Sequence, residues 1–210
     1  MWNGVAILAR GAQPLAETRR GLAGDPNDSQ SRYLEAAVGD IGVGCLYAPN
    51  GNPAPGPKFD HKLRWLDRLI DHAQGVLASG APFVLAGDFN VIPTDFDVYA
   101  PERWVGDALF RPEGQAAYRR LLEQGWIDAV RSRHPDERMY TFWHYFRNAF
   151  ARDAGIRIDH ILVSPSLASR LVAAGVDRGY RAREKSSDHA PVWIELAAGR
   201  GGRKPRRRAK

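Results

Sequence analysis

The chain has 210 residues and a mass of 23.3 kDa; 44% of its residues are hydrophobic, 26% are charged, and its formal net charge is +6. These values suit one globular domain with a large core, and they exclude disorder of the whole chain. No stretch of eighteen apolar residues is present, and Met1–Gly4 lacks the basic and then apolar order of a signal peptide. We therefore expect a cytoplasmic protein without a membrane partner.

The positive charge is concentrated at the carboxyl end. Residues 200–210 contain seven basic residues and no acidic one, which leaves 23 basic against 24 acidic residues in the rest of the chain. We therefore divide the chain into one domain, residues 1–198, and a basic tail, residues 199–210. Such a tail can bind a phosphate polymer by releasing counterions, or it can serve only as a solubilising terminus. Because Cys45 is the single cysteine, an internal disulfide and a thiolate zinc cluster are excluded.

Apolar patterns predict strands and helices in mixed order. Strands are predicted at residues 3–9, 32–38, 41–47, 82–86, 158–164 and 192–196, with the second and third forming a hairpin that turns at Gly39 and Asp40. Helical spacing predicts helices at residues 62–78, 112–124 and 166–173. Residues 10–27 and 48–57 are rich in Gly and Pro, which predicts loops. The mixed order, without repeats or linkers, indicates an α/β sandwich of one domain.

A polar pair stands where a buried strand is predicted to end. The apolar run Phe83–Ala86 is followed by Gly87, Asp88 and Asn90. At positions i and i+2 of an extended backbone, the Asp88 and Asn90 side chains leave on the same face. A carboxylate that accepts a proton from water, beside an amide that holds water or a phosphate oxygen, suits metal-assisted phosphate chemistry. An Asx turn at the end of a strand explains the same two residues.

Residues 131–157 interleave aromatic and arginine side chains. The set comprises Tyr140, Phe142, Trp143, Tyr145, Phe146 and Phe150 with Arg131, Arg133, Arg138, Arg147, Arg152 and Arg157. Aromatic rings that stack on bases and guanidinium groups that bind phosphates form an extended nucleic-acid surface. A hydrophobic loop packed on the core, with its charges in solvent, explains the pattern equally well.

Two Asp-His pairs, Asp159-His160 and Asp188-His189, lie beside the predicted strands at residues 158–164 and 192–196. Each alone is typical of a surface hydrogen bond or a cap. Together with Asp88 and Asn90, they supply oxygen ligands for a divalent cation, a base for water and donors to a phosphate.

Five short motifs occur in one order along the chain: Leu46–Gly51, Ala86–Asp95, Tyr140–Trp143, Gly155–Ile161 and Ser187–Val192. On these motifs the chain resembles the exodeoxyribonuclease III and AP endonuclease branch of the endonuclease/exonuclease/phosphatase superfamily. The resemblance implies a DNase I-like, four-layer α/β sandwich, in which two packed β-sheets are flanked by helices. It also implies a monomeric DNA repair hydrolase that needs Mg²⁺ or Mn²⁺. Such an enzyme is a 3′–5′ exonuclease on double-stranded DNA and an endonuclease at abasic sites.

The resemblance further implies catalytic roles. Asp88 is similar to the base that activates the attacking water, and Asn90 to the residue that orients water and phosphate. His189 is similar to a donor to the phosphate that is paired with Asp159. A carboxylate favours the imidazolium form, which can neutralise charge on phosphoryl oxygens. Tyr47 is similar to a tyrosine on the phosphate side of the site.

Metal and substrate ligands are implied in the same way. Asp188 matches a metal-ligating position, and the implied metal set is Asp88, Asn90, Asp188 and His189. The implied substrate-binding residues are Asn50, Trp143 and Arg157, with Trp143 as the wall that selects a flipped or baseless sugar. His160 points to the opposite face from Asp159, so we assign it a structural role.

The chain departs from the family pattern in two places. His144 stands where the family usually has an acidic residue, which changes the substrate contacts there. Family members also carry roughly sixty residues before the position of Asn3, a length estimated from a strand, helix and strand, with an Asn and a metal-binding Glu. Glu17 and Glu35 come too late to match that Glu, so we expect the first strands and helix to be absent and metal binding to be weaker.

Two alternatives to an active nuclease follow. The first is a catalytically impaired DNA-binding fragment of such an enzyme. The second is a superfamily phosphatase acting on lipids or inositol phosphates, which the motif at Tyr47 and the segment at Trp143 disfavour.

Overall fold

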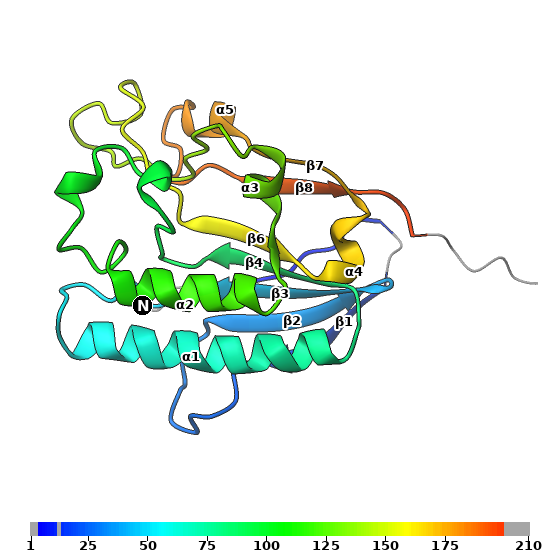
Figure 1. The fold of residues 1–210 in the computed structure, drawn as a ribbon. Coiled ribbons are helices and arrows are strands. Elements are labelled where there is room, and N and C mark those ends of the chain that lie inside the picture. The colour runs from blue at the N-terminus through cyan, green and yellow to red at the C-terminus, as the bar shows by residue number, and fades with distance from the viewer. Residues whose placement is uncertain (1–3, 12–13, 200–210) are drawn as a thin grey trace, which may run out of the picture.

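A computed structural model describes residues 4–11 and 14–199 of the protein, and these residues form a mixed α/β fold with two β-sheets (Figure 1). The strands are β1 (Leu15–Arg20), β2 (Tyr33–Val38), β3 (Ile41–Tyr47), β4 (Phe83–Asp88), β5 (Ile127–Asp128), β6 (Asp159–Val163), β7 (Leu171–Val176) and β8 (Val192–Leu196). The helices are α1 (Pro57–Ala78), α2 (Pro112–Glu123), α3 (Ala129–Arg133), α4 (Pro165–Ala168) and α5 (Arg178–Arg181), with 3₁₀ helices η1 (Asp95–Asp97) and η2 (Pro101–Arg103). One sheet has the strand order β1-β2-β3-β4-β6-β5, and β7 pairs with β8 in the second.

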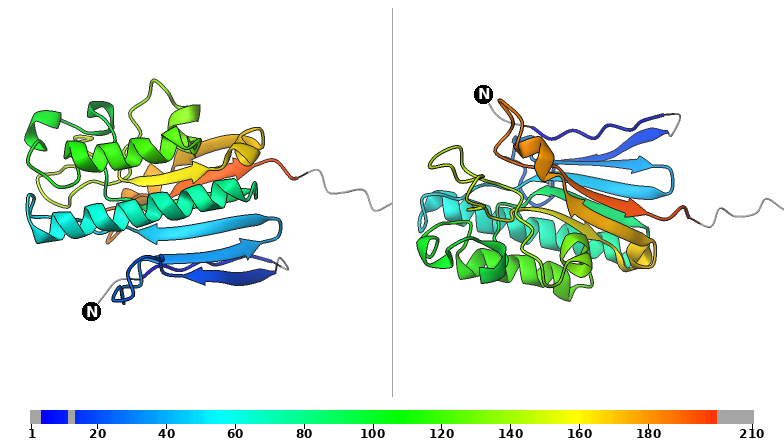
Figure 2. Two further views of the ribbon diagram at one scale, coloured as in Figure 1. Left: turned by 60° about the horizontal axis from the view of Figure 1, so that its bottom comes forward. Right: turned by 90° about the horizontal axis from the view of Figure 1, so that it is seen from above.

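Helices α1 and α2 lie side by side and cover one face of the six-stranded sheet (Figures 1 and 2). Helix α1 begins at Pro57. Proline lacks a backbone N–H, but at the first position of a helix that N–H would have no intrahelical acceptor in any case. Its buried stripe of apolar residues packs with Leu121 of α2 against Leu46, Leu85 and Leu162 of the sheet. This cluster forms the main core.

The opposite face of the large sheet packs against β7 and β8. Val84 and Ile161 on the large sheet contact a cluster that includes Leu171, Ala174 and Val192. On the outer side of the small sheet, Val172 and Trp193 remain exposed. The predicted class, an α/β sandwich with two packed sheets and flanking helices, is confirmed.

Several predicted elements agree with the structure. The hairpin of β2 and β3 turns at Gly39 and Asp40, and β8 has the predicted bounds. Helix α1 begins at Pro57 rather than Lys62, and β4 continues two residues past Ala86 to Asp88. Within the described ranges, no helix is long and apolar enough to cross a lipid bilayer.

Three predictions were wrong at the edges of the sheets. Residues 4–10 are not part of a strand, although residues 3–9 were predicted to form one. Strand β1 lies in a predicted loop, and β7 begins within the helix predicted at residues 166–173. Residues 200–210, which make up nearly all of the predicted basic tail, lie outside the described residues.

Candidate active site

Three of the predicted catalytic residues form one row across the large sheet. Tyr47 of β3 is opposite Asp88 of β4 in the parallel register, and Asp88 is opposite Asp159 of β6 in the antiparallel register. Residues directly opposite one another on neighbouring strands share a face of the sheet. Ala86 and Ile161, each two residues from the row, pack toward β7 and β8, so the row faces the second sheet.

Strand β4 ends in a tight turn that joins Asp88 to Asn90. Asn90 has a positive φ of 50°, and its backbone N–H donates to Asp88 Oδ1 at 2.8 Å. Its side-chain Nδ2 donates to Asp88 Oδ2 at 3.0 Å and to the Ala48 carbonyl at 2.9 Å. Asn50 Nδ2 donates in turn to Asn90 Oδ1 at 3.2 Å. The Asx-turn interpretation therefore describes Asp88 and Asn90, and Asn50 belongs to the same hydrogen-bonded cluster.

His189 is brought to the row by the irregular segment around Thr141. Thr141 O accepts from the Ala190 N–H at 2.7 Å, and Thr141 Oγ1 accepts from the Asp159 N–H at 3.1 Å. His189 Nδ1 lies 2.8 Å from Asp159 Oδ2. The predicted pairing of His189 with Asp159, through Nδ1 of the imidazole, is therefore present.

The charges of this cluster shift the pKa values of both His189 and Asp88. Burial alone would lower the pKa of His189, but the hydrogen bond to Asp159 and the charges of Asp159, Asp88 and Asp188 raise it to about 9. Burial and the charge of Asp159 raise the pKa of Asp88 to about 7, against the opposing effects of His189, the Asn90 N–H and Lys62. At neutral pH the site thus combines an imidazolium with a carboxylate that can accept a proton.

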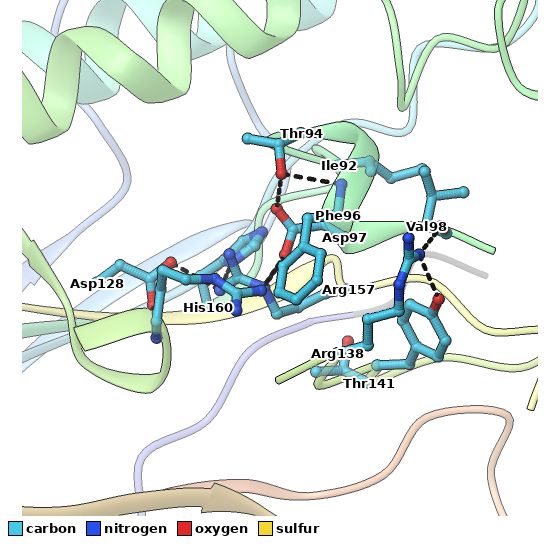
Figure 3. Close-up of polar contacts among 12 residues, drawn as sticks. Ile92, Thr94, Phe96, Asp97, Val98, Asp128, Arg138, Thr141, Arg157 and His160 are labelled. Carbon is cyan, nitrogen blue, oxygen red and sulfur yellow. Dashed lines mark hydrogen bonds and ion pairs between the residues drawn. The ribbon is translucent and has the colours of Figure 1, made fainter. Parts of the chain in front are cut away.

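The structure corrects the prediction that Arg157 binds substrate. Its side chain is 2% exposed; Nε donates to Asp97 Oδ1 at 2.7 Å and Nη1 to Asp128 Oδ2 at 2.6 Å (Figure 3). Two buried carboxylates therefore use the guanidinium that was expected to bind phosphate. Arg157 instead links η1 to the start of α3 inside the protein, through its bonds to Asp97 and Asp128.

Trp143 is also buried, with an exposed fraction of 0%. Its indole Nε1 donates to Asp153 Oδ1 at 3.1 Å, and its ring packs against Phe150 at a centroid distance of 5.2 Å. It therefore cannot form a wall for a substrate in this conformation. The structural role assigned to His160 agrees with its position: the ring is buried, and its Nε2 lies 2.9 Å from the Val91 carbonyl.

The exposed aromatic side chains of the 131–157 region lie in the loop after Trp143. Phe146 is 76% exposed and Tyr145 is 58% exposed. The Tyr145 hydroxyl donates to the Ser186 carbonyl at 2.9 Å, three residues before His189. Of the two interpretations of this region, packing therefore describes Tyr140, Trp143 and Phe150, whereas an accessible surface describes Tyr145 and Phe146.

The predicted metal ligands are only partly gathered. Among the described residues, no three His, Cys, Asp or Glu side chains are placed to hold one metal ion. Asp188 is half-buried and its backbone carbonyl accepts from the Trp143 N–H at 2.9 Å. Asp88 offers carboxylate oxygens. These would suit a hard cation that takes its other ligands from water and phosphate oxygens. The carboxylate oxygens of Asp88 are thus donors of the type that a hard divalent cation takes, but the described residues do not form a closed metal site.

Two features near the row were not expected from the sequence. Arg32 lies over the ring of Tyr47 at 5.1 Å from its centroid. Lys62 is buried and donates to the backbone of both Asn50 and Asn90. The signal for Lys62 was its position in the helix, because it interrupts the apolar stripe between Phe59 and Leu66.

A cavity of about 650 Å³ opens beside this cluster. Asp159 and His189 line it together with Ala86, Ile161 and Pro191. A carboxylate bonded to an oriented amide, beside an imidazolium, in a sandwich of two sheets, is an arrangement suited to the hydrolysis of phosphate esters.

Comparison with known proteins agrees with this class. The chain belongs to the Endonuclease/Exonuclease/phosphatase family, whose model matches residues 1–189. It is 36% identical over 205 residues to exodeoxyribonuclease III of Haemophilus influenzae, covering 92% of this chain and 76% of that relative. The predicted family is therefore confirmed.

Solved structures give the same result. An AP endonuclease from Archaeoglobus fulgidus is 34% identical with a TM-score of 0.84, covering 89% of this chain and 72% of that chain. A 3′ phosphatase from Neisseria, bound to a product DNA hairpin, is 37% identical with a TM-score of 0.83. The match covers 86% of this chain and 70% of the Neisseria chain.

Proposed function

We propose that this protein is a DNA repair nuclease that hydrolyses phosphodiester bonds, as a 3′–5′ exonuclease on double-stranded DNA and an endonuclease at abasic sites. The observation that carries the proposal is the pairing of His189 with Asp159 at 2.8 Å, next to Asp88 in the same row of the sheet. The names of the similar proteins, an exodeoxyribonuclease III and an AP endonuclease, support DNA as the substrate.

The roles of the side chains follow from their partners. Asp159 holds Nδ1 of His189, so Nε2–H can donate to a phosphoryl oxygen and offset its developing charge. Asp88 can take the proton of an attacking water, because each of its oxygens keeps a free acceptor site beside the bond to Asn90. Asn50 keeps the Asn90 amide oriented toward Asp88.

The cofactor proposed for this reaction is Mg²⁺ or Mn²⁺. When bound, such an ion supplies charge stabilisation at the phosphate and lowers the pKa of a bound water. Asp88 and Asn90 are the described residues whose oxygen atoms suit it, and Asp188 is the further carboxylate near His189.

The loop after Trp143 is proposed as part of the DNA-binding surface. Phe146 and the neighbouring Arg147 are exposed, so one can stack on a base while the other binds a phosphate. A contiguous set of rings links the loop to the active site: His144 packs on Phe142 at 4.8 Å, and Phe142 packs on His189 at 5.0 Å, centroid to centroid.

The test is cleavage of a labelled duplex with one abasic site, with Mg²⁺, with Mn²⁺ and with excess EDTA. We expect cutting beside the abasic site that requires the metal and falls at least roughly 100-fold in Asp88→Asn, because the base is lost. Asp71→Asn, which removes an exposed carboxylate of α1, is the matched control and should cut like the wild type. Metal-independent cutting, or equal cutting by Asp88→Asn, would contradict the proposal.

Other substrates separate the alternatives. Duplex DNA with a 3′-phosphate tests the activity in the name of the Neisseria neighbour, and inositol phosphates test the superfamily phosphatase. Binding of the abasic duplex without any cutting would support the impaired DNA-binding fragment instead.

A further inference from the structure

Lys62 is a buried cation that the proposed chemistry does not use. It lies on the inner side of α1 and its exposed fraction is 0%. Burial lowers the pKa of Lys62 to about 8 against the opposing charges of Asp88 and Asp107. A buried ammonium group is costly unless all of its hydrogens are bonded.

All three hydrogens of this ammonium group have backbone partners. Nζ donates to the carbonyls of Asn90 at 2.5 Å, Ala108 at 2.9 Å and Asn50 at 3.1 Å. The three carbonyls belong to three separate segments, and two of them come from residues of the site. Gly51 makes room for the lysine, because a Cβ atom at Gly51 would lie 2.7 Å from Lys62 Cδ.

Lys62 bonds to a segment of backbone that is in an uncommon conformation. Asn90 adopts a left-handed conformation with φ of 50°, which a residue other than glycine adopts at some cost. The same residue orients Asp88 through two hydrogen bonds and receives one from Asn50. By bonding to the carbonyls of Asn50 and Asn90, Lys62 therefore restrains the backbone from which both side-chain amides extend.

We propose that Lys62 is a positioning residue: it holds Asn50 and Asn90 in the geometry needed to orient phosphate and water before the substrate binds. This inference rests on the proposed function. Because Lys62 is fully buried, it is not placed to contact the substrate, so its loss should lower turnover more than it weakens substrate binding.

The test compares Lys62→Met with the wild type in steady-state cleavage of the abasic duplex with Mg²⁺. Methionine keeps the length of the side chain and removes its donors. We expect kcat to fall roughly 10- to 100-fold while KM stays within about threefold, because misplaced groups act mainly on the transition state.

Two control variants test the general loss of a positive charge from α1 and the loss of stability. Lys58→Met removes an exposed lysine from the same helix and should leave kcat unchanged. Leu69→Ala opens a cavity in the main core, where Leu69 is 0% exposed, so it lowers the melting temperature without touching the site. If Lys62→Met lowers kcat no more than Leu69→Ala does, well below both melting temperatures, the positioning role is wrong.

A second readout does not depend on activity. In ¹H–¹⁵N NMR spectra, the side-chain amide signals of Asn50 and Asn90 should move in Lys62→Met and stay in place in Lys58→Met. If the wild type fails to cut DNA but these signals move, the positioning role stands and the proposed function falls. If the signals of Lys62→Met match those of the wild type, the positioning role is overturned.

Discussion

At the scale of single residues, the proposed chemistry depends on the ion pair between Asp159 and His189. Asn at position 159 keeps the shape of the side chain but removes the charge that favours the imidazolium. We expect Asp159→Asn to lower the pKa of His189 from about 9 toward its ordinary value, and to reduce cleavage roughly 100-fold. Imidazole NMR signals followed against pH, together with cleavage rates at pH 7, measure both effects.

The control for this prediction is His160, which follows Asp159 in the sequence but lies on the other face of the sheet. Burial and the charge of Arg157 lower the pKa of His160 to about 4, so its ring should stay neutral in the variant. An unchanged pKa of His189 in Asp159→Asn would show that the carboxylate does not stabilise the imidazolium.

The sequence predicted the surroundings of a site residue better when the groups that bond to its side chain lie nearby in the sequence. Asp88 and Asn90 meet through a turn of three residues, so their spacing alone predicted that they lie together. The buried positions of Trp143 and Arg157 differ from the substrate contacts predicted for them. The partners of Arg157, Asp97 and Asp128, come from segments whose approach no local pattern reveals. An arginine suited to phosphate is equally suited to two buried carboxylates.

At the scale of elements, the position of the site depends on how closely β3 and β4 approach one another. Gly87 precedes Asp88 and has a φ of 145°; a Cβ atom there would lie 1.9 Å from the Leu46 carbonyl oxygen of β3. We therefore expect Gly87→Ala to lower the free energy of unfolding by about 3 kcal/mol or more, because backbone atoms must move. Urea unfolding followed by tryptophan fluorescence measures this loss.

Gly75 in α1 provides the matched control. A Cβ atom there meets nothing within 4 Å, and its backbone is helical. Gly75→Ala should therefore stabilise the protein by about 0.5–1 kcal/mol, because alanine favours the helix. Equal effects of the two substitutions would mean that the approach of β3 to β4 is not what requires glycine at position 87.

The elements that the sequence predicted well are those with one continuous buried face. Helix α1 and the hairpin of β2 and β3 show the expected periodicity because each packs on the main core. Strand β1 is exposed along its whole length, so no apolar alternation marks it. Strand β7 contains Ala173 and Ala174, which favour a helix locally, and its pairing with β8 overrides that preference.

At the scale of the whole molecule, the buried network around Arg157 joins segments from distant parts of the chain. Asp97 comes from η1, Asp128 from the start of α3, and His160 from β6 (Figure 3). Arg157 Nη1 lies 3.1 Å from His160 Nδ1, and His160 Nε2 lies 2.9 Å from the Val91 carbonyl. Because the arginine donates to Nδ1, the ring is neutral with its hydrogen on Nε2.

This network predicts how stability depends on pH. The pKa of His160 is about 4 in the folded protein and near 6.5 when unfolded, so its contribution is complete above pH 6.5 and is lost as the pH falls toward 4. The loss amounts to about 3 kcal/mol. Asp88 acts in the opposite direction in the same range, because its raised pKa of about 7 means that protonation stabilises the fold as the pH falls.

The two effects can be separated in an Asp88→Asn background, where the opposing carboxylate is absent. We expect the free energy of unfolding, measured with urea between pH 7 and pH 4.5, to fall steeply in that background and much less when His160→Gln is added. Glutamine can still donate to the Val91 carbonyl but does not titrate in this range. Parallel slopes for the two variants would show that His160 is not the group whose protonation opens the network. A smaller slope in the double variant would instead identify a neutral imidazole at the centre of the fold as the main source of acid sensitivity.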